Sequence, residues 1–145
     1  MKLNSKIRKK ITDYFSKKPE IEAVYLYGSQ AKNVARSDSD IDLAALVNDK
    51  GNFSGFDIPQ TRYAHELQRI IHKEIEVQNL EDVSIDFAHR VLSEGQLLVG
   101  LESKKRVEFE ERILRVYFDM KPFFDEYVQS IHEIAKKGEL NVRYF

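Results

Sequence analysis

The sequence contains no cysteine and no long apolar run, and its positive and negative charges nearly balance. The absence of cysteine excludes a disulfide scaffold and any metal site built from thiolates. No apolar run approaches the roughly 20 residues that a membrane-spanning helix needs. A net charge of −1 argues against a protein whose main task is to coat nucleic acid. We therefore expect neither membrane insertion nor direct nucleic-acid binding.

The composition is that of a domain with a hydrophobic core. Hydrophobic residues make up 42% and charged residues 32% of the 145 positions, which suits one domain with an appended helical segment. The N-terminal stretch MKLNSKIRKKITDYF is too highly charged for a signal peptide. Together with the lack of cysteine, this predicts a cytoplasmic protein.

Residues 1–102 are predicted to form an α+β core, in which helices flank a small mixed sheet of three or four strands. Apolar residues at helical spacing predict the helices, with Leu67, Ile70 and Ile71 facing inward. A β-rich composition predicts the first strand, and alternation predicts the other two. The predicted elements are a helix over 4–17, strands over 21–27 and 40–47, a helix from 59 to about 73, a strand over 73–80 and a helix over 84–95.

The composition changes from about Ser103 onward. Residues 103–145 have the pattern of two amphipathic helices, and a break is expected near Pro122 because proline lacks a backbone amide hydrogen. Eight of the sixteen aromatic residues lie in 109–145. Such an apolar surface must pack on something, and the core, a partner protein, or both remain open.

Two aspartates stand on one face of a predicted strand. Asp40 and Asp42 are two residues apart, so their stems lie ~7 Å from one another. Alone, the pair also fits a charged edge strand. The next strand, however, carries Glu74 and Glu76 on its own polar face. Carboxylates from two strands can hold Mg²⁺ together with phosphate oxygens and water, and two such ions ~3.5–4 Å apart assist in-line phosphoryl displacement.

A Gly-Ser pair ends the strand that precedes these aspartates. Gly28 allows the backbone to approach a ligand closely, and the hydroxyl of Ser29 and nearby amide groups can hold phosphate. Ten residues separate Ser29 from Asp40-Ile41-Asp42. This spacing resembles the G-S-x10-D-x-D signature of the polymerase-beta-like nucleotidyltransferase superfamily.

The wider stretch YLYGSQAKNVARSDSDIDL resembles the minimal nucleotidyltransferase (MNT) branch of that superfamily, and the similarity extends over about residues 20–120. Two positions depart from the usual pattern. Asn33 stands where the branch has glycine, and asparagine tolerates the left-handed conformation that a turn requires. Glu76 stands where the branch has a third aspartate, which keeps the charge on a longer side chain.

The resemblance implies nucleotidyl transfer from ATP. The triphosphate would lie against Gly28 and Ser29, and Asp40 and Asp42 would ligate two Mg²⁺ ions. Glu76 would either ligate the ion that activates the acceptor hydroxyl or act as its general base. Attack at the α-phosphorus would then expel pyrophosphate.

Three further residues of the motif have less defined roles. Lys32 and Arg36 are candidates for neutralising the phosphates of the nucleotide, and an ordinary solvated basic turn is the competing interpretation. Asp38 is expected to form a turn rather than to bind a metal ion.

MNT proteins of this size resemble antitoxins paired with a HEPN-domain ribonuclease toxin. The resemblance implies transfer of AMP from ATP to a hydroxyl of that toxin, expected to be a tyrosine, which neutralises it, and association of the two proteins as a hetero-oligomer. Two alternatives stay open: an antitoxin that only binds its toxin, and a transferase that modifies a small hydroxylated molecule.

Overall fold

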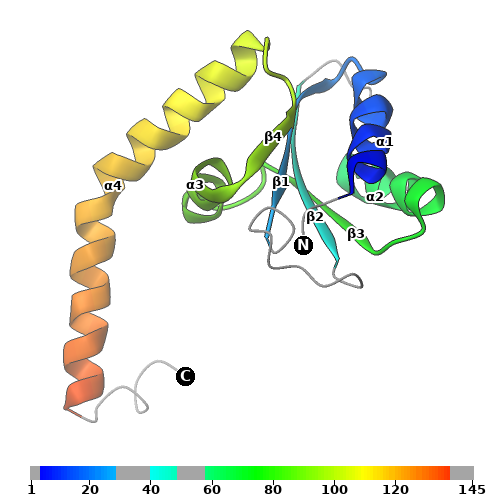
Figure 1. Cartoon of the computed structure of the whole chain (residues 1–145). Coiled ribbons are helices and arrows are strands. Elements are labelled where there is room, and N and C mark those ends of the chain that lie inside the picture. The colour runs from blue at the N-terminus through cyan, green and yellow to red at the C-terminus, as the bar shows by residue number, and fades with distance from the viewer. Residues whose placement is uncertain (1–3, 29–39, 49–57, 138–145) are drawn as a thin grey trace.

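The computed structural model describes residues 4–28, 40–48 and 58–137 of the chain (Figure 1). In these ranges, strands β1 and β2 are antiparallel, β1 and β4 are antiparallel, and β2 and β3 are parallel, so the sheet is mixed with the order β3-β2-β1-β4. This confirms the predicted α+β fold. The elements are α1 (Ser5–Ser16), β1 (Ile21–Tyr27), β2 (Ile41–Val47), α2 (Pro59–Ile71), β3 (Ile75–Asn79), α3 (Ile85–Glu94), β4 (Gln96–Val99) and α4 (Lys104–Lys136).

Helices α1 and α2 cover one face of the sheet (Figure 1). The side chain of Asn4 caps α1 by accepting a hydrogen bond of 2.8 Å from the amide of Lys6. Pro59 begins α2, where a missing amide hydrogen costs nothing. The buried cluster on this face consists of Ile11, Phe15, Val24, Leu26, Ile41, Leu43, Ala45, Tyr63, Leu67, Ile71, Ile75 and Val77.

The inward-facing residues predicted for α2 are partly wrong. Leu67 and Ile71 are buried with Tyr63, but Ile70 is 42% exposed. Tyr63, Leu67 and Ile71 are four residues apart and lie on one side of the helix, whereas Ile70 is rotated about 100° from Ile71. The stripe that meets the sheet is therefore narrower than the sequence pattern predicts.

Helix α3 and the first half of α4 cover the opposite face of the sheet. Beyond Asp42, this face of β2 continues with Ala44 and Leu46, both buried. The aspartate face of β2 is thus polar at its beginning and apolar further on. This second cluster consists of Ala23, Tyr25, Ala44, Leu46, Leu80, Ala88, Val91, Phe109 and Ile113.

Strand β4 is an element that the sequence pattern did not predict. It contains four residues, all of them half-buried, so it shows no alternation of apolar and polar positions. Its place at the sheet edge comes from pairing with β1, for example Leu26 with Gln96. A strand this short forms because it pairs with the neighbouring strand, and its own sequence has no pattern that would predict it.

The prediction of two C-terminal helices is wrong, because α4 is one helix of 33 residues with Pro122 inside it. Proline removes one backbone hydrogen bond, which bends a helix without ending it when the flanking residues favour helix. Figure 1 shows that α4 changes direction near its middle. None of the helices in the described ranges is long and apolar enough to cross a membrane.

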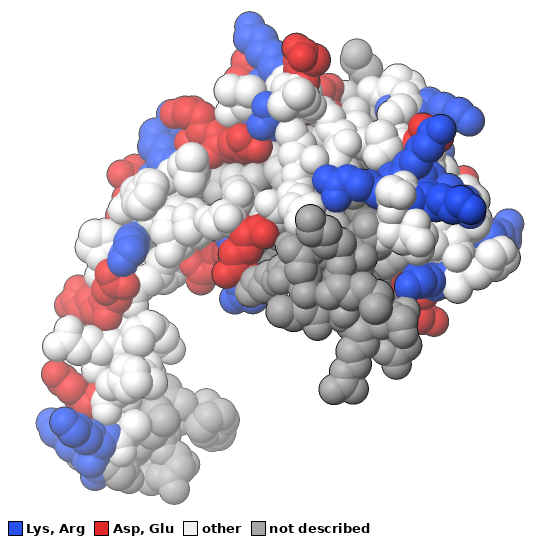
Figure 2. Space-filling view, in the orientation of Figure 1, with Lys and Arg blue, Asp and Glu red and all other residues white. Residues whose placement is uncertain are grey.

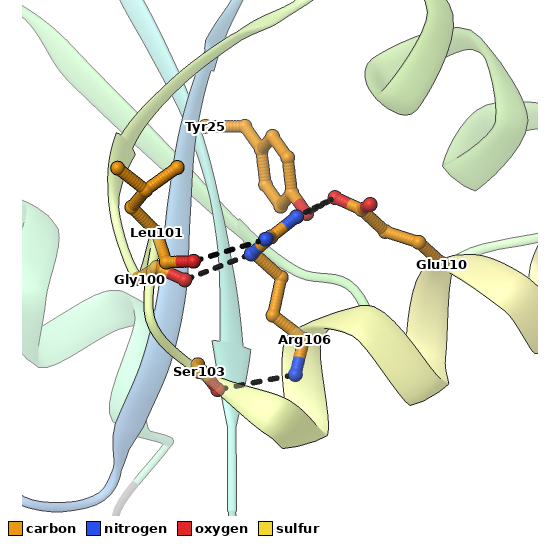
Figure 3. Close-up of polar contacts among 6 residues, drawn as sticks. All are labelled: Tyr25, Gly100, Leu101, Ser103, Arg106 and Glu110. Atoms are coloured by element: carbon orange, nitrogen blue, oxygen red, sulfur yellow. Dashed lines mark hydrogen bonds and ion pairs between the residues drawn. The ribbon is translucent and has the colours of Figure 1, made fainter.

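Arg106 links the beginning of α4 to the segment before it and, through Glu110, to β1 (Figure 3). The Arg106 guanidinium donates to the backbone oxygens of Gly100 and Leu101 at 2.8 and 3.2 Å and pairs with Glu110 at 2.9 Å. Glu110 also accepts from the hydroxyl of Tyr25, a buried residue of β1. Burial and this hydrogen bond raise the pKa of Tyr25, which keeps the phenol a donor.

We expect Arg106→Met to destabilise the fold by about 2 kcal/mol, because it leaves two carbonyl groups and a partly buried carboxylate without their donor. The measurement is the free energy of unfolding in urea. Arg115→Met is the matched control. Arg115 forms the same kind of pair with Glu111 on the same helix, but both side chains are about 60% exposed, so a loss under roughly 0.5 kcal/mol is expected. Equal losses in both variants would contradict an anchoring role for Arg106.

Candidate functional site

Strand pairing places three polar side chains side by side in one row. Tyr27 of β1 pairs with Asp42 of β2, and Asp42 pairs with Glu76 of β3. Paired residues on neighbouring strands point to the same face of a sheet, and the strands are about 4.8 Å apart. The row therefore brings Asp42 and Glu76, which are far apart in the sequence, next to one another.

The electrostatics of Asp42 are unfavourable in the protein alone. Burial raises the pKa of its carboxyl, and the negative charges of Glu76 and Asp40 raise it further. Asp42 is half-buried, while Asp40, just before β2, and Glu76 are exposed. A bound cation would remove the repulsion among these three carboxylates.

Gly28 follows β1 and lies against Asp42. Its φ is +75°, in the left-handed region that favours glycine, and a Cβ at this position would lie 2.5 Å from Oδ2 of Asp42. The close approach predicted for this glycine is thus directed at the catalytic candidate itself. Any side chain here would displace the Asp42 carboxylate.

Tyr27 is a member of the row that the sequence analysis did not single out. Its pKa is raised by burial and then by the charges of Asp42 and Glu76, so the phenol stays protonated. Its ring packs edge-on against Phe87 of α3, with centroids 5.4 Å apart. The sequence feature that could have identified Tyr27 as a site residue is its position immediately before Gly28, at the end of a strand.

The surroundings of Glu76 also order its side chain. Gln78, two residues further along β3, donates a hydrogen bond of 3.0 Å to Oε1 of Glu76.

The other predicted site residues, Ser29, Lys32 and Arg36, together with Asp38, lie outside the described residues.

The donors at this site suit a hard divalent cation. Carboxylate oxygens from two neighbouring strands, with Asp40 just ahead of them, match Mg²⁺, which commonly takes one or two carboxylates and completes its shell with phosphate oxygens and water. Among the residues that the structure describes, no group of three or more histidine, aspartate or glutamate side chains could hold a metal ion.

A cavity of about 800 Å³ lies elsewhere, where the far end of β2 meets α4. It is lined by Val47, Asn48, Phe109 and Arg112, among other residues, and not by Asp40, Asp42 or Glu76. The carboxylates of Asp42 and Glu76 lie at the opposite end of β2 from this cavity.

Comparison with models of protein families identifies the family to which this chain belongs. The model of the family described as polymerase beta, nucleotidyltransferase matches residues 9–104. This range includes the three strands that carry Tyr27, Asp42 and Glu76, and also the Gly-Ser motif. The chain therefore belongs to the polymerase beta nucleotidyltransferase family, and the resemblance seen in its motif is confirmed.

Among characterised relatives, the protein adenylyltransferase MntA of Shewanella oneidensis is 22% identical over 125 residues, covering 83% of this chain and 86% of the relative. A chain of a toxin–antitoxin crystal structure with AMP-PNP is 19% identical, with a TM-score of 0.61 and coverage of 87% of this chain and 99% of that one. A chain from the complex of tri-AMPylated Shewanella oneidensis HEPN toxin with MNT antitoxin is 17% identical, with a TM-score of 0.54 and coverage of 83% and 98%. The two solved structures share the fold of this chain.

Proposed function

We propose that this chain is an antitoxin-type, Mg²⁺-dependent protein adenylyltransferase that transfers AMP from ATP to a hydroxyl of a cognate HEPN ribonuclease toxin, taken to be a tyrosine. The observation that carries the proposal is the pairing of Asp42 with Glu76, beside Gly28, in a member of the nucleotidyltransferase family. The relative named protein adenylyltransferase, which this chain matches over most of its length, supports the choice of a protein acceptor.

The proposed reaction is one in-line displacement. The acceptor oxygen forms a bond to the α-phosphorus of ATP, the bond from that phosphorus to the bridging oxygen breaks, and pyrophosphate leaves. When bound, Mg²⁺ supplies positive charge that stabilises the transferring phosphate and the leaving group. Asp40 and Asp42 would hold it, and the backbone at Gly28 and the hydroxyl of Ser29 would receive the phosphates.

Glu76 has two possible roles in this reaction, and both use its position beside Asp42. It either accepts the proton of the acceptor hydroxyl or adds a carboxylate oxygen to the cation. The hydrogen bond from Gln78 limits the directions in which its side chain can point. Lys32 and Arg36 are proposed to neutralise the phosphates.

The test is to incubate the protein with Mg²⁺, ATP and the HEPN-domain protein encoded beside it, and to measure the intact mass of that protein. One or more additions of AMP, with loss of its ribonuclease activity, are the expected result. A stable complex without a change in mass would support an antitoxin that only binds. AMP added to an aminoglycoside-like alcohol but not to the protein would contradict a protein acceptor.

For Glu76, we expect Glu76→Gln to lower kcat about 100-fold, since the amide neither accepts the proton nor balances the cation. Glu76→Asp, which restores the residue usual in the MNT branch, should retain activity within about tenfold. Glu102→Gln is the control, because Glu102 is an exposed carboxylate that follows β4, at the opposite end of the sheet. If Glu76→Gln transferred AMP as fast as the wild type, Glu76 would have no place in the chemistry.

A further inference from the structure

The second half of α4 carries an apolar seam that, beyond its first residue, extends past the other described helices and strands (Figure 1). From Ile113 the seam continues at alternating steps of four and three residues, the spacing at which one helix packs along another. Met120 is 38% and Tyr127 is 65% exposed, and Phe124, Ile131 and Ile134 are half-buried. We call this set the α4 seam; its residues are Tyr117, Met120, Phe124, Tyr127, Ile131 and Ile134.

The beginning of the seam shows what kind of surface it matches. Ile113, one step before the seam, is buried in the second core, and Tyr117 stacks on His89 of α3 with ring centroids 3.6 Å apart. The same side of α4 thus already packs against a helix. Beyond Tyr117 this side continues past α3, so a further helix is the element that would extend the packing.

The bend of α4 directs the seam inward. Pro122 is two residues from both Met120 and Phe124, so it lies on the opposite side of the helix. The proline ring crowds the carbonyl four residues earlier, which bends the helix away from the proline. Pro122 is therefore on the convex side, and the seam is on the concave side.

The free half of α4 stands at the end of the molecule that carries the site. In Figure 1 it descends at the end of the sheet where β1 finishes and β2 begins. Figure 2 shows that it stands away from the body of the protein and leaves an open space between them. A protein bound in that space would contact the seam at the end of the sheet that carries Tyr27 and Asp42.

Charge favours a partner other than a second copy of this chain. The stretch between Tyr117 and Ile134 contains four acidic residues, Asp119, Asp125, Glu126 and Glu133, and one lysine or arginine, Lys121. Lys121 pairs with Asp125 at 2.8 Å. Two such helices side by side would bring like charges together. The matching surface is an apolar stripe flanked by lysine or arginine.

We infer that the α4 seam is the docking surface for a helix of the acceptor protein, one with an apolar stripe and basic flanks; this inference rests on the proposed function. Docking there would hold the acceptor beside the carboxylate row while its hydroxyl enters the site. The effect on the reaction is one of proximity. The seam therefore sets the affinity for the acceptor, and the carboxylates set the rate.

The test compares two substitutions that each add one negative charge to the free half of α4. Tyr127→Asp places the charge within the seam, and Gln129→Asp places it on the outer side, where Gln129 is exposed. The probe is the neighbouring HEPN-domain protein, with its Kd measured by biolayer interferometry and AMP transfer followed as its concentration varies. We expect Tyr127→Asp to raise Kd and KM at least tenfold, about 1.4 kcal/mol, with kcat unchanged. Gln129→Asp should stay within twofold.

The outcomes separate docking from catalysis. Unchanged Kd and KM in Tyr127→Asp would overturn the docking surface and leave the proposed function standing. Binding that Tyr127→Asp destroys, in a wild-type protein that transfers no AMP, would support the docking surface and contradict the proposed function. A wild type that does not bind the HEPN-domain protein would overturn both. A wild-type dimer in light scattering that Tyr127→Asp converts to a monomer would assign the seam to a second copy and overturn the inference.

Discussion

Replacing Asp42 by asparagine is expected to lower AMP transfer about a thousandfold while raising thermal stability in the absence of divalent metal. The loss of activity follows because the variant removes the one carboxylate that is paired with Glu76 and also contacts the Gly28 backbone position. The gain in stability follows because the pKa of Asp42 is raised by burial and by the charges of Glu76 and Asp40. Asparagine keeps the shape without that repulsion, and a rise of about 2–5 °C in Tm is expected.

The pH dependence of stability provides a second measurement on the same variant. A carboxyl whose pKa is higher in the folded state stabilises the fold only while protonated. Its contribution is complete below the unfolded pKa of about 3.9 and is lost as the pH rises through the folded pKa. Wild-type protein in EDTA should lose more stability than Asp42→Asn across that interval, and the two curves should run parallel above it.

Two results would contradict this account of Asp42. Wild-type transfer rates in Asp42→Asn would exclude Asp42 from the site, provided that intact mass confirms the substitution. A lower Tm of the variant in EDTA would show that the carboxylate has a favourable partner in the folded protein rather than repulsive neighbours. Addition of Mg²⁺ should raise the Tm of the wild type and leave the variant unchanged.

Gly28→Ala is expected to reduce AMP transfer about 100-fold and to destabilise the protein by about 1–2 kcal/mol. The loss of stability arises because φ at this position is +75°, where a side chain is strained. The loss of activity arises because the new Cβ would meet Oδ2 of Asp42 at 2.5 Å. That carboxylate is the movable end of a side chain, so it would turn away and leave the row. Urea unfolding and initial rates of transfer are the two measurements.

Gly100→Ala is the matched comparison for this glycine. Its φ is +106° and a Cβ would lie 2.2 Å from the backbone oxygen of Glu22, so it should destabilise the fold at least as strongly. It follows β4, at the end of the sheet away from Asp42, and the folded fraction should keep its specific activity. If both variants lost specific activity in proportion to their stability, Gly28 would have a structural role only.

The local sequence predicts which segments form the main helices and strands. Strand β1 is observed over Ile21–Tyr27 as its β-rich composition predicts, and α2 begins at Pro59 as expected. The spacing of apolar residues reflects which side of a helix or strand faces the core. It therefore predicts an element correctly where one side is buried and the other is exposed. It fails where burial departs from that pattern, as at the exposed Ile70 and in half-buried β4.

The C-terminal segment shows a different limit. The sequence correctly indicated amphipathic helix in this region, but it wrongly predicted two helices with a break near Pro122. A proline in the sequence indicates a missing backbone hydrogen bond and a local bend. Whether the helix continues depends on the residues that follow. Only the three-dimensional structure shows that the first half of α4 belongs to the core while the second half leaves it.

The sequence by itself indicated the family of this protein: the Gly28-Ser29 pair and the Asp40-Ile41-Asp42 triplet at their spacing resemble the nucleotidyltransferase signature, and such a signature is a local feature of the chain. Tertiary structure decided which side chains share a row. The registers that join Tyr27 to Asp42 and Asp42 to Glu76 depend on pairing between distant strands. The direction of the α4 seam depends on a bend and on packing against α3. Such long-range contacts leave no periodic signal in the sequence.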